Sequence, residues 1–228
     1  TISMVDPKAA WAVLKADAYG HGLVPMVGAA RDGGAHWLGV ATPAEALAVR
    51  AAGDTGPVLC WLAAPGEDLS AAVAADVEVT ASSVEQLEQV VTVGGRPRTQ
   101  LKVDTGLARN GAFGADWSRL VEAAAAHQRA GRVEITGVWS HFACADEPKH
   151  PANDRQEQVF ARAVDELAAA GVEPRWRHLA NSPATLTRPS SHLDLVRVGM
   201  ASYGVDPAPG RHEVPLTPVM TLRGRLAA

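Results

Sequence analysis

The chain has 228 residues, of which 47% are hydrophobic and 20% charged, a composition typical of a globular domain with one large core. Its formal net charge is −4 and the basic residues are scattered, which argues against nucleic acid or an anionic membrane as a partner. Cys60 and Cys144 are too few for a disulfide framework or a zinc site, so we expect two buried free thiols and no bound metal. No apolar run is long enough to span a membrane and no signal peptide is recognised, so we expect a cytoplasmic location.

Eight short β-rich runs alternate with Ala-rich helical patterns. The expected strands are 11–15, 37–41, 58–61, 77–80, 101–104, 135–141, 176–180 and 195–198. Eight strand–helix units in a chain of this length predict an α/β fold, the (β/α)8 or TIM barrel. The main alternative is an open, doubly wound sheet, but no GxGxxG or GxxxxGK[ST] loop follows an early strand.

Helix signals separate these runs. Thr42 and Glu45 form a capping box with proline at the first helical position, and residues 82–85 repeat the capping pattern. Further helices are expected over 116–131 and 151–170, each ending at or just before a glycine. We assign residues 1–212 to the barrel. Residues 213–228 are expected to begin a β-rich C-terminal domain that is otherwise missing.

Polar residues at the strand ends are candidates for chemistry, because the loops at the carboxyl end of such a barrel surround one cavity. Lys15 directly follows an apolar run and is expected inside the barrel mouth, where a desolvated amine can form a Schiff base. Tyr19 and the Gly-His-Gly turn after it offer a phenol and open backbone suited to a phosphate. From its position alone, Lys15 is equally a surface lysine at a strand end.

Five segments resemble, in order, motifs of the alanine racemase family. They are K-A-D-A-Y-G-H-G at 15–22, L-K-V-D-T-G-L-A-R-N-G at 101–111, W-S-H-F-A-C-A-D at 139–146, H-L-A-N-S-P-A-T at 178–185 and D-L-V-R-V-G-M at 194–200. The resemblance covers nearly the whole chain. It implies a pyridoxal 5′-phosphate (PLP) enzyme, an isomerase that interconverts L-alanine and D-alanine and supplies D-alanine for peptidoglycan. It also implies a homodimer in the full-length form.

The resemblance implies how the cofactor is held. Lys15 would carry PLP as a Schiff base and would be one of two acid–base groups at the substrate Cα. The other residues expected to bind the cofactor, chiefly its phosphate, are Tyr19, Asn181, Ser182, Gly199 and Met200. Independently of the resemblance, Ser182 followed by proline looks like a helix N-cap, where free N–H groups favour an anion.

Two arginines receive roles in the same way. Arg197 would face the pyridine nitrogen and donate a hydrogen bond to it, because an arginine essentially never gives up its proton. The alternative is an arginine ion-paired with Asp194 on a solvated rim. Arg109 would approach the phenolic oxygen of the cofactor and the carboxylate of the substrate. Without the resemblance, Arg109 is interpreted as an arginine at a helix start or on the surface.

The fifth and sixth strands supply two more candidates. Lys102 and Asp104 are expected on the same side of the fifth strand, and a lysine inside the barrel needs neutralising. In the family the matching lysine is often carbamylated, and we carry this for Lys102 as a hypothesis. His141 is implied to support a catalytic tyrosine rather than to act as the base, with a plain core histidine as the alternative. Trp61 and Trp139 are expected to be barrel packing.

The family pattern also includes parts that this sequence does not show. Alanine racemases carry a tyrosine in the second domain of the partner subunit, which serves as the base on the opposite face of the substrate. We therefore expect the 228 residues alone to bind PLP but to racemise alanine poorly. Two alternatives remain open: a stand-alone barrel that carries PLP without turnover, and a non-catalytic scaffold that keeps the fold.

Overall fold

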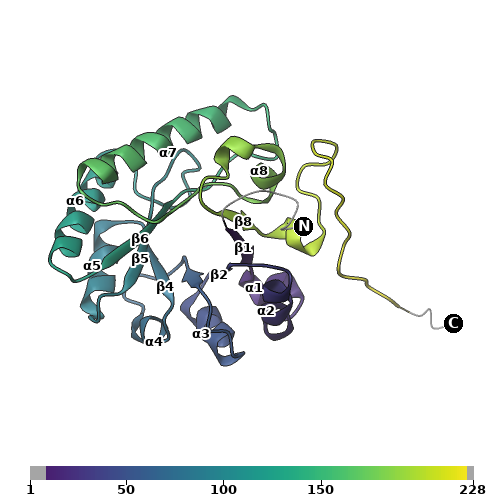
Figure 1. Cartoon of the computed structure of the whole chain (residues 1–228), viewed down its shortest axis with the longest axis horizontal. Coiled ribbons are helices and arrows are strands. Elements are labelled where there is room, and N and C mark those ends of the chain that lie inside the picture. Colours follow the sequence, from purple (N-terminus) through teal and green to yellow (C-terminus); the bar gives the residue numbers. More distant parts are fainter. Residues whose placement is uncertain (1–8, 225–228) are drawn as a thin grey trace.

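Eight parallel strands form where the β-rich runs predict them. The computed structural model describes residues 9–224. The strands are β1 (Ala10–Val13), β2 (Trp37–Val40), β3 (Val58–Cys60), β4 (Glu78–Ala81), β5 (Arg98–Lys102), β6 (Glu134–Trp139), β7 (Trp176–His178) and β8 (Val196–Val198). Each strand pairs with the next in sequence from β1 to β7, and β1 also pairs with β8. This order confirms the (β/α)8 barrel (Figure 1).

The seam between β7 and β8 is closed by a few specific bonds rather than by a continuous ladder. The amide of Asp194 donates to the carbonyl of Arg177 at 3.1 Å, and the amide of Arg197 donates to Ala180 at 3.0 Å. The Asp194 carboxylate also accepts from the backbone N–H and the Nε of Arg177, at 3.2 and 2.7 Å. Asp194 therefore ties the two last strands together.

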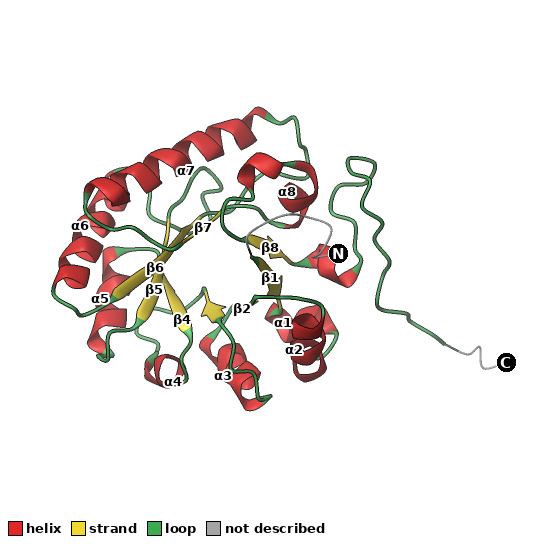
Figure 2. Ribbon diagram, viewed as in Figure 1, coloured by secondary structure: helices red, strands yellow, loops and turns green. Residues whose placement is uncertain are grey.

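The helices surround the barrel (Figure 2). They are α1 (Lys15–Gly20), α2 (Leu23–Asp32), α3 (Pro43–Ala51), α4 (Ser70–Ala74), α5 (Val84–Thr92), α6 (Ala115–Arg129), α7 (Pro151–Ala169) and α8 (Ser182–Thr187), with 3-10 turns at Pro189–Ser191 and Met200–Tyr203. The capping box of Thr42 and Glu45 is confirmed, and the Ser83 hydroxyl caps α5 by accepting from the Gln86 amide. The two longest helices begin and end within two residues of the predicted bounds.

The barrel interior has an apolar half and a polar half. The apolar half lies along β1, β2 and β3 and the start of β8. Its large side chains pack together and are those of Trp11, Trp37, Leu59 and Leu195. The interior of β4 to β7 instead carries buried polar side chains, namely Glu78, Gln100, Thr136 and His178. Barrel interiors are more often filled by branched aliphatic residues. A polar interior of this kind has to be satisfied by internal hydrogen bonds.

The two cysteines differ in burial. Cys60 is a buried free thiol, and burial raises its pKa to about 12. Cys144 is only half-buried, so the prediction of two buried thiols is wrong for Cys144.

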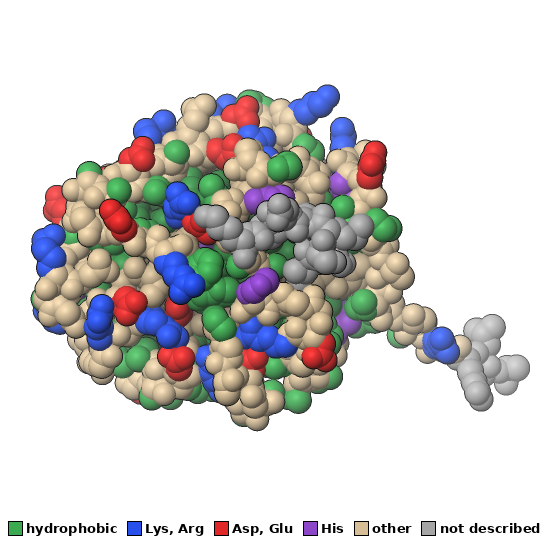
Figure 3. All heavy atoms as spheres, in the orientation of Figure 1, with side chains coloured by type: hydrophobic (Ala, Val, Ile, Leu, Met, Phe, Trp, Pro, Cys, Tyr) green, Lys and Arg blue, Asp and Glu red, His purple; other side chains and the backbone are tan. Residues whose placement is uncertain are grey.

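Acidic and basic side chains are interspersed on the face seen in Figure 3. Crossing a bilayer takes a longer apolar run than any helix between residues 9 and 224 provides. Residues 213–224 contain no helix or strand, and the domain boundary at 212 stays a prediction.

The close approach of Trp11 to β2 makes a stability prediction. A Cβ added at Gly39 would lie 1.6 Å from Trp11 Nε1, so Gly39→Ala would force the indole to move within a packed barrel. We expect a loss of about 3 kcal/mol in unfolding free energy, measured by urea denaturation. As a control, Gly28→Ala within α2 meets nothing within 4 Å and should gain about 0.5 to 1 kcal/mol. Equal effects of the two substitutions would contradict this packing.

Candidate functional site

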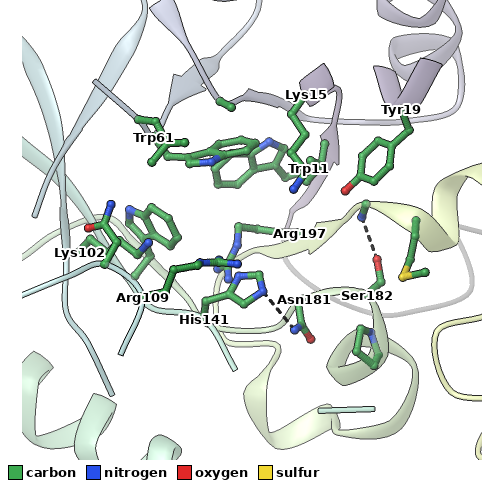
Figure 4. Close-up of a pocket in the computed structure, with 18 residues that line it drawn as sticks. Trp11, Lys15, Tyr19, Trp61, Lys102, Arg109, His141, Asn181, Ser182 and Arg197 are labelled. Atoms are coloured by element: carbon green, nitrogen blue, oxygen red, sulfur yellow. Dashed lines mark hydrogen bonds between the residues drawn. The ribbon is translucent and has the colours of Figure 1, made fainter. Parts of the chain in front are cut away.

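A cavity of about 500 Å³ lies at the carboxyl ends of the strands, where a barrel of this kind places its ligand site. Figure 4 shows Tyr19 and Ser182 toward one end, Lys102 and Arg109 toward the other, and Lys15 and Arg197 between them. The cavity is lined by all ten residues singled out from the sequence: Lys15, Tyr19, Lys102, Arg109, His141, Asn181, Ser182, Arg197, Gly199 and Met200. The structure thus brings together residues that are up to 185 positions apart, from 15 to 200.

Lys15 is the first residue of α1, which is a left-handed turn rather than a regular right-handed helix. β1 ends at Val13, two residues earlier than predicted, so Lys15 stands on the rim of the barrel. Residues 16–19 have φ between 52° and 56°, although none of them is glycine. Such a conformation costs roughly 1 to 2 kcal/mol for each residue. The turn brings the Tyr19 ring to 5.7 Å from the Lys15 amine.

Hydrogen bonds from neighbouring helices hold this turn in place. The Ala16 amide donates to Glu45 Oε1 at 2.7 Å, and Glu45 is also the capping residue of α3. Asp17 Oδ1 accepts from the amide of Leu23, the first residue of α2, at 2.6 Å. Backbone strain maintained by several independent contacts is characteristic of functional sites.

Tyr19, Ser182 and the chain after β8 meet at one end of the cavity. A Cβ at Gly199 would lie 2.6 Å from the Tyr19 hydroxyl, so this close approach requires glycine. Ser182 Oγ accepts from the Gly199 amide at 2.9 Å and is 3.5 Å from the Ala201 amide. Two hydroxyls and several backbone N–H groups therefore gather at this end, as an anion would require.

The prediction that Ser182 is the N-cap of its helix is wrong. Asn181 is the cap: its backbone is extended and its Oδ1 accepts from the Ala184 amide at 3.3 Å. Ser182 is the first helical residue of α8. Because its hydroxyl is not used by its own helix, it bonds to the chain after β8 instead.

Arg197 is buried, with 5% of its surface exposed, and it faces the interior of the barrel. Nη1 donates to His178 Nδ1 at 2.9 Å, and Nη2 donates to the carbonyls of Ser140 and Leu179 at 2.6 and 3.0 Å. Burial, and secondarily the charge of Arg109, lower the pKa of Arg197 to about 9. Within residues 9–224 its Nε makes no hydrogen bond.

The alternative position for Arg197, an ion pair with Asp194 on the rim, is excluded by these contacts. The Asp194 carboxylate forms its ion pair with Arg177, and the guanidinium of Arg197 bonds to an imidazole and two carbonyls. Arg197 also lies over Trp139, with its guanidinium carbon 5.1 Å from the ring centroid. These contacts hold the arginine in the wall of the cavity.

Lys102 is 3% exposed, and its amine lies 4.4 Å from the centre of the Trp139 ring. Burial, followed by the charges of Arg109 and Arg197, lowers the pKa of Lys102 to about 8, and Asp104 opposes this shift. Asp104 follows the end of β5, and its carboxylate accepts from the amides of Gly106 and Ala108 in the loop, at 2.9 and 3.1 Å. Among the described residues, no carboxylate forms an ion pair with Lys102.

His141 lies two residues beyond the end of β6, not within it as predicted. Asn181 Nδ2 is 3.5 Å from His141 Nε2, and since Asn181 Oδ1 already accepts from a backbone amide, its NH2 group faces the imidazole. Burial, then the charge of Arg197 with smaller contributions from other cations, lowers the pKa of His141 well below its usual value. The ring is therefore neutral at neutral pH and accepts at Nε2.

Four residues of the site had no assigned role. Trp11 lines the cavity, and so do Trp61 and Trp139, which were expected only to pack the barrel. His178 stacks on Trp139, with ring centroids 5.8 Å apart, and bonds to Arg197. The period-two pattern of the strands contains a signal for two of these, because Trp11 and His178 alternate with residues that face the outer helices.

The charges around the cavity are of one sign. Its lining includes Lys15, Lys102, Arg109 and Arg197 and, within residues 9–224, no aspartate or glutamate. Positive charges confined at short range in a poorly solvated site repel one another. An anionic ligand would relieve that repulsion, so the lining suits a molecule with phosphate or carboxylate groups.

Comparisons with known proteins agree on one family. Residues 2–207 match the family model described as the alanine racemase N-terminal domain. The alanine racemase of Salinispora arenicola is 54% identical over 219 residues, which is 94% of this chain and 59% of that protein. The alanine racemase of Streptomyces coelicolor is 49% identical over 228 residues, covering 95% of this chain and 58% of that protein. The chain thus spans a little over half the length of these relatives.

Solved structures give the same result. A crystal structure of alanine racemase from D-cycloserine-producing Streptomyces lavendulae has a TM-score of 0.86 at 52% identity, covering 88% of this chain and 54% of that one. The crystal structure of the alanine racemase of Bacillus anthracis with bound L-Ala-P has a TM-score of 0.84 at 32% identity, covering 92% of this chain and 55% of that one.

The lowered pKa of Lys102 makes a prediction about stability and pH. Between about pH 8, the folded value, and 10.5, the usual value, the unfolded chain holds one proton more than the folded chain. Below about pH 8, the folded chain pays the full free-energy cost of burying the charged ammonium of Lys102. This cost decreases as the pH rises from about 8 to 10.5, because the buried amine loses its proton. Lys102→Met should therefore raise the unfolding free energy at pH 7.5 by about 3 kcal/mol, and by less at pH 9.5.

Urea denaturation in buffer free of carbon dioxide measures both values. Lys149, which is exposed on the loop before α7, provides the control, and Lys149→Met should change neither. If Lys102→Met raised the unfolding free energy equally at both pH values, burial of the charged ammonium of Lys102 would not be the cause of the stabilisation.

Proposed function

The chain belongs to the alanine racemase family, and from that premise we propose that its barrel binds PLP and takes part in the interconversion of L-alanine and D-alanine. The observation that carries the proposal is the cavity with four cations and, in the described lining, no carboxylate. A phosphate, a phenolic oxygen and a substrate carboxylate are anionic groups, and they would balance these charges.

The residues present fit the cofactor. Lys15 would hold it covalently through its amine. The phosphate would be bound at the end where Tyr19, Ser182 and the amides after β8 gather, because hydroxyls and backbone N–H groups converge there. Arg197 would donate to the ring nitrogen through one of the two N–H groups, on Nε and Nη1, that its bonds to protein groups leave over. Arg109, at the opposite end, would meet the phenolic oxygen and the substrate carboxylate.

When bound, PLP supplies a conjugated ring that takes up the electrons left at the substrate Cα when its proton is removed. Arg197 keeps its own proton at neutral pH, since its pKa of about 9 lies above that range. It therefore donates a hydrogen bond to the ring nitrogen without protonating it, which keeps the ring a weak electron sink. We infer that this favours prompt return of a proton to Cα over transfer of the amino group.

Racemisation needs a proton acceptor on one face of Cα and a donor on the other. Lys15 would serve one face. The family resemblance assigns the other face to a tyrosine from the partner subunit of a homodimer, supported by His141, whose neutral ring accepts from Asn181 at Nε2 and so is left with an N–H at Nδ1 to donate. We further propose that the full-length protein supplies D-alanine for peptidoglycan in the cytoplasm.

Attachment of PLP to Lys15 is the first test. After incubation with PLP and reduction with borohydride, peptide mass mapping should find the cofactor on Lys15 and not on the exposed Lys149. Lys15→Ala should remove the label. A label that persists in Lys15→Ala, or that is spread over surface lysines, would contradict the proposal. The 228 residues alone should racemise alanine much more slowly than the full-length Streptomyces coelicolor relative, because only one face is served.

Carbamylation of Lys102 is the second test. Its lowered pKa leaves part of the amine unprotonated near pH 8, and this form adds to carbon dioxide to give a carbamate anion, with release of one proton. The anion would pair with Arg109. With 13C-bicarbonate, NMR should show a carbamate carbon that disappears in Lys102→Met and persists in Lys15→Ala. A bare ammonium at Lys102 under these conditions would remove the hypothesis.

A further inference from the structure

A line of hydrogen bonds crosses the polar half of the barrel interior below the cavity. From Arg197 Nη1 it passes to His178 Nδ1 at 2.9 Å, from His178 Nε2 to Gln100 Oε1 at 2.7 Å, and from Gln100 Nε2 to Glu78 Oε2 at 2.8 Å. The four side chains come from β8, β7, β5 and β4, and none is more than 5% exposed. Glu78 and Gln100 do not line the cavity.

The direction of these bonds follows from what each group can do. A guanidinium only donates, so His178 Nδ1 must accept from Arg197. The neutral imidazole then carries its proton on Nε2 and donates it to Gln100 Oε1. Burial, then the charge of Arg197, lowers the pKa of His178 well below its usual value, in keeping with a neutral ring. The NH2 group of Gln100 is left to donate to Glu78.

Glu78 is the end of the line because the side chains in contact with its carboxylate oxygens, those of Gln100, Thr136 and Arg98, all donate. Thr136 Oγ1 donates to the same carboxylate oxygen at 2.6 Å, and Arg98 Nε lies 3.4 Å from the other oxygen. Burial raises the pKa of Glu78, and these donors oppose that shift. As a carboxylate, Glu78 can only accept, so it excludes the flipped orientation of Gln100, in which the amide oxygen would face it.

The His178 ring has little freedom to avoid this constraint. It stacks on Trp139 with an angle of 7° between the ring planes, and Trp11 packs edge-on against it at 5.3 Å. A flipped Gln100 would present its NH2 group to His178 and so require the proton on Nδ1. That proton would point at the N–H of Arg197, and the bond between them would be lost.

We propose that Glu78 is a positioning residue of the cofactor site. By accepting only, it fixes the amide of Gln100, the tautomer of His178 and thereby the guanidinium of Arg197, which then presents an N–H that is not used within the protein to the cofactor ring. The last step rests on the proposed function. The first steps hold in the chain without ligand, so the two can be tested separately.

The tautomer of His178 is the direct readout. In the chain without PLP and labelled with 15N-histidine, NMR of the ring nitrogens should show His178 neutral with the proton on Nε2. In Glu78→Gln, residue 78 gains a donor and both orientations of Gln100 become possible, so a mixture of tautomers is expected. Thr136→Val is the matched control: it also removes a buried hydrogen bond to Glu78, but it leaves the carboxylate and should keep a single tautomer.

The second readout is PLP affinity. The dissociation constant of PLP should rise about tenfold in Glu78→Gln, the effect of losing one charge-assisted hydrogen bond, and should change less than twofold in Thr136→Val. The absorbance spectrum of the bound cofactor should shift in Glu78→Gln alone, since the environment of the ring nitrogen changes.

Two results would overturn the inference. One is a single, unchanged His178 tautomer together with unchanged PLP affinity in Glu78→Gln. The other, which needs no variant to fold, is a proton on Nδ1 of His178 in the unaltered chain. Absence of PLP binding to the unaltered chain would instead remove the proposed function, while the tautomer measurement would still decide the role of Glu78.

Discussion

The site depends on a buried charge that has no carboxylate beside it among residues 9–224. Arg197 lies inside the barrel, and within the described residues it forms no ion pair. Burying a charge in this way is costly unless other groups compensate. Two carbonyls and an imidazole provide part of that compensation. Burial is the main cause of the lowered pKa of Lys102 and of His141, and the charges of Arg197 and Arg109 add to it, so the two arginines contribute together to the electrostatics of the cavity.

The fold provides what this charge requires. The strands from β4 to β7 carry polar side chains into the interior, and these connect Arg197 to Glu78 near the opposite end of the barrel. On the other side, the left-handed turn after β1 places Lys15 and Tyr19 above the arginine and is itself held by Glu45 and Asp17. A rigid polar support and a strained turn thus face each other across the cavity. An anionic ligand in the cavity would offset the positive charges of the lysines and arginines that line it.

Most of the strands and helices and the main residues of the site could be predicted from the sequence, because helix caps and the alternation of strand residues are local signals. The β5 strand was predicted at 101–104 but spans Arg98–Lys102, since Thr99 and Gln100 look too polar for a buried strand until their partners are known. The left-handed turn could not be predicted, because three of its four residues are Ala or Tyr, which rarely adopt positive φ, and a single Asp that tolerates it is a weak signal. His178 lay inside a recognised motif but had no role, as its tautomer depends on residues from three other strands.

The central claim is that one aromatic cofactor bridges Lys15 and Arg197 within this cavity. A crystal structure of the chain with PLP tests it most directly. The account predicts continuous density from the Lys15 amine to the ring, the phosphate at the end formed by Tyr19 and Ser182, and the ring nitrogen within hydrogen-bond distance of Arg197. A cofactor bound elsewhere, or with its ring nitrogen turned away from Arg197, would contradict it.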